Sequence, residues 1–361
     1  MLWHAYALLS HGGDRIGLRS RAHAGRLPRP CRHPDEVLRA LERIDTAVWT
    51  ANALSACAET GLIEALERPA AIGEIALRTG LPEAAVRTLV GLLAGLGFVV
   101  EDGERVTAAP ALVPFTSGAG AATFRAALRA PLLQAEQFRS HAAAGAVAIE
   151  GWTHTDQAII EAQGVMTRMW ARKAIPKLRF LPGLAGRLSP PGAARLDGGA
   201  GAAGLSIALC DAFPHLSAVA LEPAPQPAAI GEGQIAAAGL SDRIALRRQR
   251  VEHLDDAAAF DLAFLPQMFL PDAIMPETAR RVFRALRPGG WLLVAVLARK
   301  GHDLPASVSR LKNLLWGGNL RDVDAVRPHL ADEGFRPIIR APGGDAFRMI
   351  CARRPIARGA S

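Results

Sequence analysis

Residues 194–213, ARLDGGAGAAGLSIALCDAF, follow the pattern of a buried strand, a glycine-rich turn and a helix. Glycine adopts the backbone conformations of a tight turn and lets a ligand approach the main chain. From this stretch to the end of the chain, strand-like apolar runs alternate with helix-like segments. The alternation predicts an α/β domain over residues 191–361, built on a doubly wound, Rossmann-like parallel sheet.

The glycine-rich turn alone leaves two cofactors open. Gly199, Gly201 and Gly204 fit the spacing of dinucleotide sites, so an NAD(P) oxidoreductase is one alternative. Asp197 stands two residues before the first of these glycines and would repel a pyrophosphate but attract a cationic sulfonium group. Glu222 ends the next predicted strand, where a carboxylate accepts hydrogen bonds from the ribose of either cofactor.

Two later segments point to one family. FDLAFLPQMF at 260–269 and the Pro-Gly-Gly turn at 288–290 give a strand, helix, turn and strand succession without a second dinucleotide-binding half. With the Asp197 loop, the chain resembles the class I methyltransferases. In its two-domain layout it resembles the small-molecule O-methyltransferases of bacterial and plant type, over roughly residues 36–354.

The resemblance implies S-adenosyl-L-methionine as the cofactor and assigns residues to its parts. The loop would surround the methionine moiety, Glu222 would bind the ribose, the stretch after ALRRQ would meet the adenine, and the end of FDLAFLPQ would flank the transferable methyl. The implied cofactor-binding residues are Asp197, Gly199, Gly201, Glu222, Pro223, Arg250, Val251, Glu252, Pro266 and Gln267.

Three departures from the family pattern bear on the chemistry. Ala203 stands where the family has its third loop glycine, and Arg250 where it has an adenine-contacting aspartate. Met268-Phe269-Leu270 replaces a His-Asp-Trp string whose histidine deprotonates the acceptor hydroxyl. No catalytic residue can therefore be named, and the acceptor is a carbon, a nitrogen or an already acidic oxygen. A fold that binds the cofactor for cyclisation or decarboxylation is a further alternative.

Residues 116–190 are Ala-rich and predict a helical linker that roofs the substrate pocket. Met166, Met169 and Trp170 share one helical face, which fits either ordinary core or a pocket lining for an apolar or aromatic secondary metabolite, together with Gln267. Arg310 and Lys312, in SVSRLKNLLWGGN, are interpreted as surface charges.

Residues 34–115 predict a winged-helix-like, largely α-helical domain: two short helices around a Leu-Pro turn, then two β-like stretches around Asp-Gly. The second helix, 83–96, offers only Arg87 among apolar residues, which favours dimerisation over DNA reading. The apolar helical surface of residues 34–96 exceeds what so small a domain buries, so a homodimer is expected.

The formal charge of +8 is concentrated at the two ends. Residues 1–33 contribute six arginines against Asp14, and residues 353–361 contribute three more, so the remaining 319 residues sum to zero. A flexible basic tail over 1–33 and no nucleic-acid partner are expected. Four scattered cysteines indicate no metal site, and the absence of a long uncharged apolar run indicates a cytoplasmic protein without a membrane segment.

Overall fold

The computed structural model describes residues 30–145, 156–296, 303–318, 323–341 and 348–356. Residues 1–29 of the predicted basic tail lie outside this part. The chain divides into two compact units, Leu2–Gln137 and Phe138–Ser361, with the boundary inside one long helix, α6 (Gly118–Ala143). No helix of the described residues is long and apolar enough to cross a membrane.

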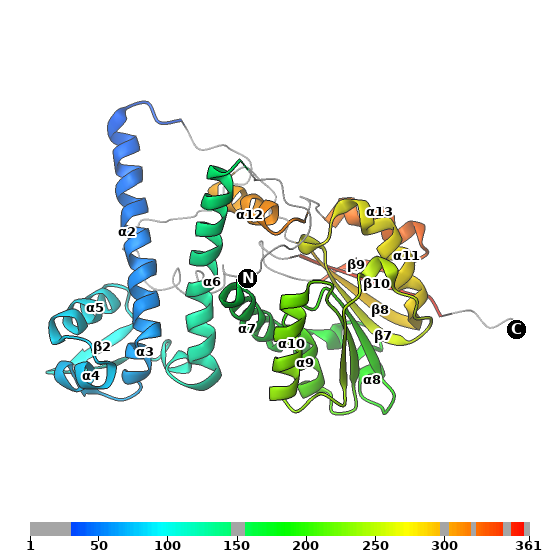
Figure 1. Cartoon of the computed structure of the whole chain (residues 1–361), viewed down its shortest axis with the longest axis horizontal. Helices are drawn as coiled ribbons and strands as arrows, with labels where there is room; N and C mark the ends of the chain where they lie inside the picture. The colour runs from blue at the N-terminus through cyan, green and yellow to red at the C-terminus, as the bar shows by residue number, and fades with distance from the viewer. Residues whose placement is uncertain (1–29, 146–155, 297–302, 319–322, 342–347, 357–361) are drawn as a thin grey trace, which may run out of the picture. The chain divides into compact units, whose positions relative to one another are not determined.

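The first unit contains the predicted helix, turn, helix and hairpin (Figure 1). Its elements are α2 (Pro34–Glu59), α3 (Leu62–Ala65), β1 (Ala70–Ala71), α4 (Ile72–Thr79), α5 (Glu83–Gly95), β2 (Val99–Asp102), β3 (Arg105–Ala108) and η1 (Val113–Phe115). The hairpin gains a third strand because β1 pairs antiparallel with β3, giving the order β1-β3-β2. Gly80, at φ 69°, ends α4 and allows the sharp turn before Pro82.

The second unit is the α/β domain. Before its sheet come α7 (Gln157–Ala174), η2 (Ile175–Phe180) and α8 (Leu184–Leu188). The sheet region contains β4 (Ala194–Gly198), α9 (Gly204–Ala212), β5 (Ser217–Leu221), α10 (Pro225–Ala237), β6 (Ile244–Arg247), η3 (Val251–His253), β7 (Phe260–Pro266), η4 (Gln267–Phe269), η5 (Asp272–Ile274), α11 (Met275–Ala285), β8 (Leu286–Val296), α12 (Leu304–Leu315), α13 (Val323–Asp332), β9 (Ile338–Arg340) and β10 (Arg348–Arg353).

The seven strands of this unit lie in the order β6-β5-β4-β7-β8-β10-β9. All neighbouring pairs among β6, β5, β4, β7 and β8 are parallel, as the sequence predicts. In contrast, β10 runs antiparallel to both of its neighbours, β8 and β9. The all-parallel prediction is wrong for β10, because the short connection from β9 can return only to an antiparallel position. The Pro-Gly-Gly predicted as a turn lies within β8, where it shifts the register against β7.

Helices cover both faces of the sheet, which confirms the doubly wound architecture (Figure 1). On one face, α7 to α10 pack with residues such as Leu209, Leu262 and Trp291. On the other, α11 and α13 pack with Leu196 and Val294. Because side chains alternate along a strand, Arg195 and Asp197 point to the α9 face while Leu196 points away from it. The glycine-rich loop lies at the edge of the sheet formed by the carboxyl ends of β4, β5 and β7.

Ala203 stores backbone strain at the start of α9. It is fully buried and has φ 58°, the left-handed region that costs a residue with a Cβ roughly 1–2 kcal/mol. We expect Ala203→Gly to raise the free energy of unfolding by about 0.5–1 kcal/mol in urea titrations. Ala208→Gly, inside α9, is the matched control and should lower it by a similar amount. Equal losses in the two variants would contradict this account.

Candidate active site

The glycine-rich loop lies flush between the ends of β5 and β7. The amides of Gly199 and Ala200 donate to the carbonyl oxygen of Leu221, at 3.1 and 2.9 Å. Gly199 has φ 116° and Gly201 φ 52°. A Cβ on Gly199 would come within 3.0 Å of Pro266 Cγ. These two glycines are therefore required by the turn and by the close approach of Pro266.

Gly204 has a different role from the one its spacing suggests. A Cβ at this position would lie 2.5 Å from the carbonyl oxygen of Gly164 in α7. Gly204 therefore lets α7 pack directly on α9, and Arg168 of α7 also donates to Gln234 Oε1 of α10 at 3.1 Å. The apparent dinucleotide spacing thus arises from helix packing, since the loop itself ends at Ala203.

Glu222 follows β5 directly and reaches the loop. Its Oε2 accepts from the Gly201 amide and its Oε1 from the Ala224 amide, both at 2.9 Å. The residue is 8% exposed. Burial raises the pKa of the Glu222 carboxyl above its ordinary value, while the amide hydrogen bonds from Ala224 and Gly201 act in the lowering direction. Each oxygen keeps a lone pair beyond its backbone partner, so the carboxylate can accept from two adjacent hydroxyls.

The Asp197 carboxylate is buried and hydrogen-bonded to side chains inside the domain. Its Oδ2 accepts from Ser206 Oγ at 2.7 Å and from Arg195 Nη1 at 3.3 Å, and the Arg195 side chain is fully buried. Arg195 Nη1 also donates to Ser206 Oγ at 2.9 Å. Arg195 was not singled out by the sequence; a charged residue inside an apolar strand is the signal that identifies it. Its charge compensates the carboxylate that the sequence assigns to the cofactor's cation.

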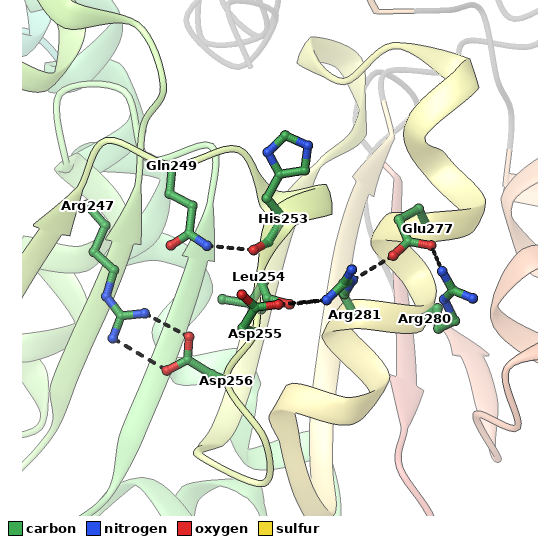
Figure 2. A network of polar contacts seen from close by, with 9 residues as sticks. All are labelled: Arg247, Gln249, His253, Leu254, Asp255, Asp256, Glu277, Arg280 and Arg281. Carbon is green, nitrogen blue, oxygen red and sulfur yellow. Dashed lines mark hydrogen bonds and ion pairs between the residues drawn. The ribbon is translucent and has the colours of Figure 1, made fainter.

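The predicted adenine-edge segment is held by a polar network (Figure 2). Arg247 at the end of β6 binds Asp256 with both Nη atoms, at 2.7 and 3.4 Å. Arg281 of α11 donates to Asp255 Oδ1 at 2.7 Å and to Glu277 at 2.6 Å, while Glu277 also pairs with Arg280. Gln249 donates to the His253 carbonyl oxygen at 2.7 Å. The network fixes η3 from both sides, and the His253 imidazole points away from it.

Within this segment the three predicted residues differ in position. Val251 is buried, and its Cγ2 would lie 3.1 Å from a Cβ placed on Gly198. Glu252 is nearly buried and pairs with the exposed Arg250 at 3.4 Å. Pro223, which follows Glu222, is exposed. Val251 therefore lies beside the loop, whereas Glu252 is held by Arg250, whose side chain faces solvent.

At the end of β7, Pro266 is buried beside the loop, and the next residue, Gln267, is fully buried. The next residues are apolar and closed to water: Met268 is 1% exposed and Leu270 8%. The Phe269 ring lies 5.3 Å from that of Trp316, which follows α12. The edge that would bear the acceptor's base in the O-methyltransferases is thus an apolar and aromatic wall.

The three residues of α7 that the sequence assigns to the substrate pocket lie in different surroundings. Met166 is buried, Met169 is partly buried, and Trp170 lines a small cavity of about 30 Å³ between α7, α9 and the sheet. The Trp170 ring lies 5.8 Å from the Phe264 ring of β7. All the residues lining this cavity are apolar, and neither Met166 nor Met169 is among them. In the described residues no group of three or more His, Cys, Asp or Glu side chains is placed to hold a metal.

The glycine-rich loop, Glu222 after β5 and Pro266 at the end of β7 thus meet at one edge of the sheet. The backbone of Gly199–Gly201, the Glu222 carboxylate, Val251 and Pro266 come from four different segments. A nucleoside with a flexible charged tail fits this arrangement, because the carboxylate can hold ribose and the glycines leave the main chain open to the tail.

Two family models match the chain. Residues 196–290 match a methyltransferase domain, and residues 61–103 match the IclR helix-turn-helix domain. The first match covers the loop, Glu222 and the Pro-Gly-Gly bulge. A search of curated proteins finds no match.

Solved structures share the fold over nearly the whole chain. An O-methyltransferase family protein from Burkholderia thailandensis is 14% identical, with 89% of this chain and 99% of that chain covered at a TM-score of 0.69. The mitomycin 7-O-methyltransferase MmcR is 22% identical, with 89% and 98% covered at 0.63. Human N-acetylserotonin methyltransferase is 15% identical, with 90% and 100% covered at 0.63. The class I methyltransferase fold with an N-terminal winged-helix-type domain is confirmed.

Proposed function

We propose that this chain is an S-adenosyl-L-methionine-dependent methyltransferase that acts on a small apolar or aromatic secondary metabolite. The observation that carries the proposal is the Glu222 carboxylate, buried at the end of β5 and hydrogen-bonded to the loop amide of Gly201. The methyltransferase-domain match over residues 196–290 supports it, as do related folds described in complex with S-adenosylmethionine and S-adenosylhomocysteine.

Each part of the site has a task in this proposal. Glu222 binds the ribose hydroxyls, the Gly199–Gly201 backbone surrounds the methionine moiety, and Val251 with Glu252 meets the adenine. Bound there, the cofactor supplies an electrophilic methyl group. The buried residues Met268 and Leu270 exclude water, and holding the acceptor in line with that methyl is the main contribution such a pocket makes.

The proposal is tested by comparing cofactors in a thermal-shift assay. S-adenosylhomocysteine at 100 times its Kd should stabilise the protein by about 2.7 kcal/mol, whereas NADH and NADPH should leave the melting temperature unchanged. Methyl transfer is then checked with methyl-tritiated cofactor. Stabilisation by NADH or NADPH alone would overturn the proposal in favour of an oxidoreductase.

We also propose that the chain forms a homodimer through α2. Apolar side chains recur along one stripe of this helix and are 47–70% exposed: Val37, Leu38, Leu41, Ile44, Val48 and Trp49. A second copy of the same stripe would bury them by two-fold pairing. The solvent-facing side of α5 presents Glu83, Arg87 and Thr88, too little positive charge to favour DNA as the partner.

Ile44→Asp places a charge in the middle of this stripe, at a residue 58% exposed in the single chain. We expect light scattering to show a dimer for the wild type and a monomer for the variant, because burying an unpaired carboxylate is costly. Leu77→Asp, at an 88% exposed position in α4, is the control and should leave the dimer intact. A monomeric wild type would contradict the proposal.

A further inference from the structure

Helix α12 buries polar residues beside apolar ones and exposes several of its leucines. Leu304 is 75% exposed, and Leu311 and Leu314 are also exposed. Ser309 and Asn313 are buried, and Lys312 is half-buried. Ser309 Oγ donates to the Pro305 carbonyl oxygen at 3.0 Å, and the apolar residues Ala306 and Leu315 are buried on the same helix. Exposed leucines together with buried polar residues depart from the usual pattern of a surface helix, which buries its apolar side. Lys312 lies among these inward-facing polar residues.

The last turn of α12 docks at the end of β7, beside the segment that lacks the family's histidine. Trp316 is 5% exposed and packs with Met268, and its ring meets Phe269. A Cβ on Gly318 would lie 1.9 Å from the Met268 carbonyl oxygen, so the chain leaving α12 passes directly over that residue. Lys312 precedes Trp316 by four residues and shares its side of the helix.

Lys312 combines burial with an absence of charge partners. Its ammonium makes no hydrogen bond or ion pair with the residues that the structure describes, and burial lowers its pKa. Phe138 of α6 and Met349 of β10 pack in one cluster with Trp316, and titratable groups lie next to them in sequence: Arg139 and His141 on α6, and Arg348 on β10. Arg310 lies on α12 itself, and Asp272 lies in η5. Burial alone accounts for the shift of Lys312. The surface-charge interpretation of Lys312 is therefore wrong.

Two more observations fit a chemical role. The chain has only four lysines among its 42 Lys and Arg residues, at 173, 177, 300 and 312. A lysine can give up its proton when desolvated, whereas an arginine cannot, so this choice at a half-buried position matters. The Trp316 Nε1 is also buried without a hydrogen-bond partner among the described residues. It leaves a donor for a ligand oxygen.

Building on the proposed methyl transfer, we propose that Lys312 is the general base of this site and that the acceptor is an aromatic hydroxyl compound, its second oxygen accepting from Trp316 Nε1. The neutral Lys312 amine takes the hydroxyl proton and becomes an ammonium. The acceptor oxygen forms a bond to the methyl carbon as the carbon–sulfur bond breaks and its electron pair stays on sulfur. The products are the methyl ether and a neutral thioether, and the ammonium returns its proton to solvent.

The first test needs no cofactor. Lysine labelled with ¹³C at the ε position gives one NMR resonance for each of the four lysines, and the resonance lost in Lys312→Met identifies that residue. We expect its titration midpoint to lie below the ordinary lysine value of about 10.4. A midpoint at or above that value would overturn the proposal whatever the chain binds.

The second test compares 4-methoxyphenol with the more acidic 4-nitrophenol as methyl acceptors, because both carry a second oxygen that can accept from Trp316 Nε1. Lys312→Met and Lys312→Arg should each lower kcat for 4-methoxyphenol by roughly 10²–10⁴-fold, with a much smaller loss for 4-nitrophenol, which is ionised without a base. Lys177→Met, at an exposed position, is the control. Full activity in Lys312→Arg would exclude proton transfer by this residue.

The two proposals fail in different ways. If S-adenosylhomocysteine does not bind, the proposed function fails while the NMR result for Lys312 still stands. If it binds and the wild type methylates neither phenol, the function as a methyltransferase survives but the aromatic hydroxyl class is wrong.

Discussion

Glu222→Ala is expected to weaken S-adenosylhomocysteine binding by about tenfold to a hundredfold. The carboxylate would offer the ribose two charge-assisted hydrogen bonds, and losing such bonds costs roughly 1.5–3 kcal/mol. Isothermal titration calorimetry measures the change. Glu232→Ala, at an exposed position of α10, is the matched control and should bind as the wild type does. Unchanged binding in Glu222→Ala would remove this edge of the sheet as the cofactor site.

The pH dependence of binding gives Glu222 a second signature. Because burial raises its folded-state pKa, the carboxyl takes up a proton at a higher pH than an ordinary glutamate as the solution is acidified. Cofactor affinity should therefore fall with decreasing pH, starting above the pH at which exposed carboxyls titrate. Glu222→Gln should bind weakly throughout and lose this pH dependence.

The raised pKa of Glu222 also affects folding stability. The effect has the opposite sign from that of a salt-bridged carboxylate, whose folded-state pKa is lowered. A carboxyl with a raised folded pKa favours folding in its protonated form, and this contribution is lost as pH rises through that pKa. Ionised Glu222 thus costs the free protein stability at neutral pH. The site keeps this charge although it is unfavourable for folding, which fits a residue retained for its ligand.

The parts of the site that backbone geometry dictates could be predicted from sequence. A turn from a strand into a helix needs glycine at Gly199 and Gly201, and a carboxylate after the next parallel strand must lie at the same edge. The winged-helix-type pattern is predictable for a similar reason, since Gly80 and Pro82 mark the turn between α4 and α5.

Features that depend on packing could not be predicted. Gly204 looks like a loop glycine, but its role depends on α7, which lies about 40 residues earlier in the chain. The reversed direction of β10 depends on how the chain returns from β9. Lys312 looks like a surface charge because its neighbours Leu311 and Leu314 suggest an apolar buried side, and only the tertiary structure shows the opposite face turned inward.

Arg195→Met is expected to lower the free energy of unfolding by about 3–5 kcal/mol, a large effect for one substitution. Arg195 and Asp197 have side chains 0% and 2% exposed, so removing the guanidinium leaves a buried carboxylate whose one remaining side-chain partner among the described residues is Ser206. Asp197→Asn alone should also destabilise the domain, because it leaves the buried arginine without a counter-charge. Urea unfolding of both variants measures these losses.

The double variant Arg195→Met, Asp197→Asn separates charge pairing from cofactor binding. Since both charges are removed together, most of the stability should return, and the deviation from additivity should be several kcal/mol. If Arg195 compensates Asp197, the double variant should also keep the wild-type ratio of S-adenosylmethionine to S-adenosylhomocysteine affinity. Asp197→Asn alone adds net positive charge beneath the loop, so it should weaken the cationic cofactor more than the neutral product. A double variant that loses this preference would mean that Asp197 attracts the cofactor's cation directly, despite its buried partner.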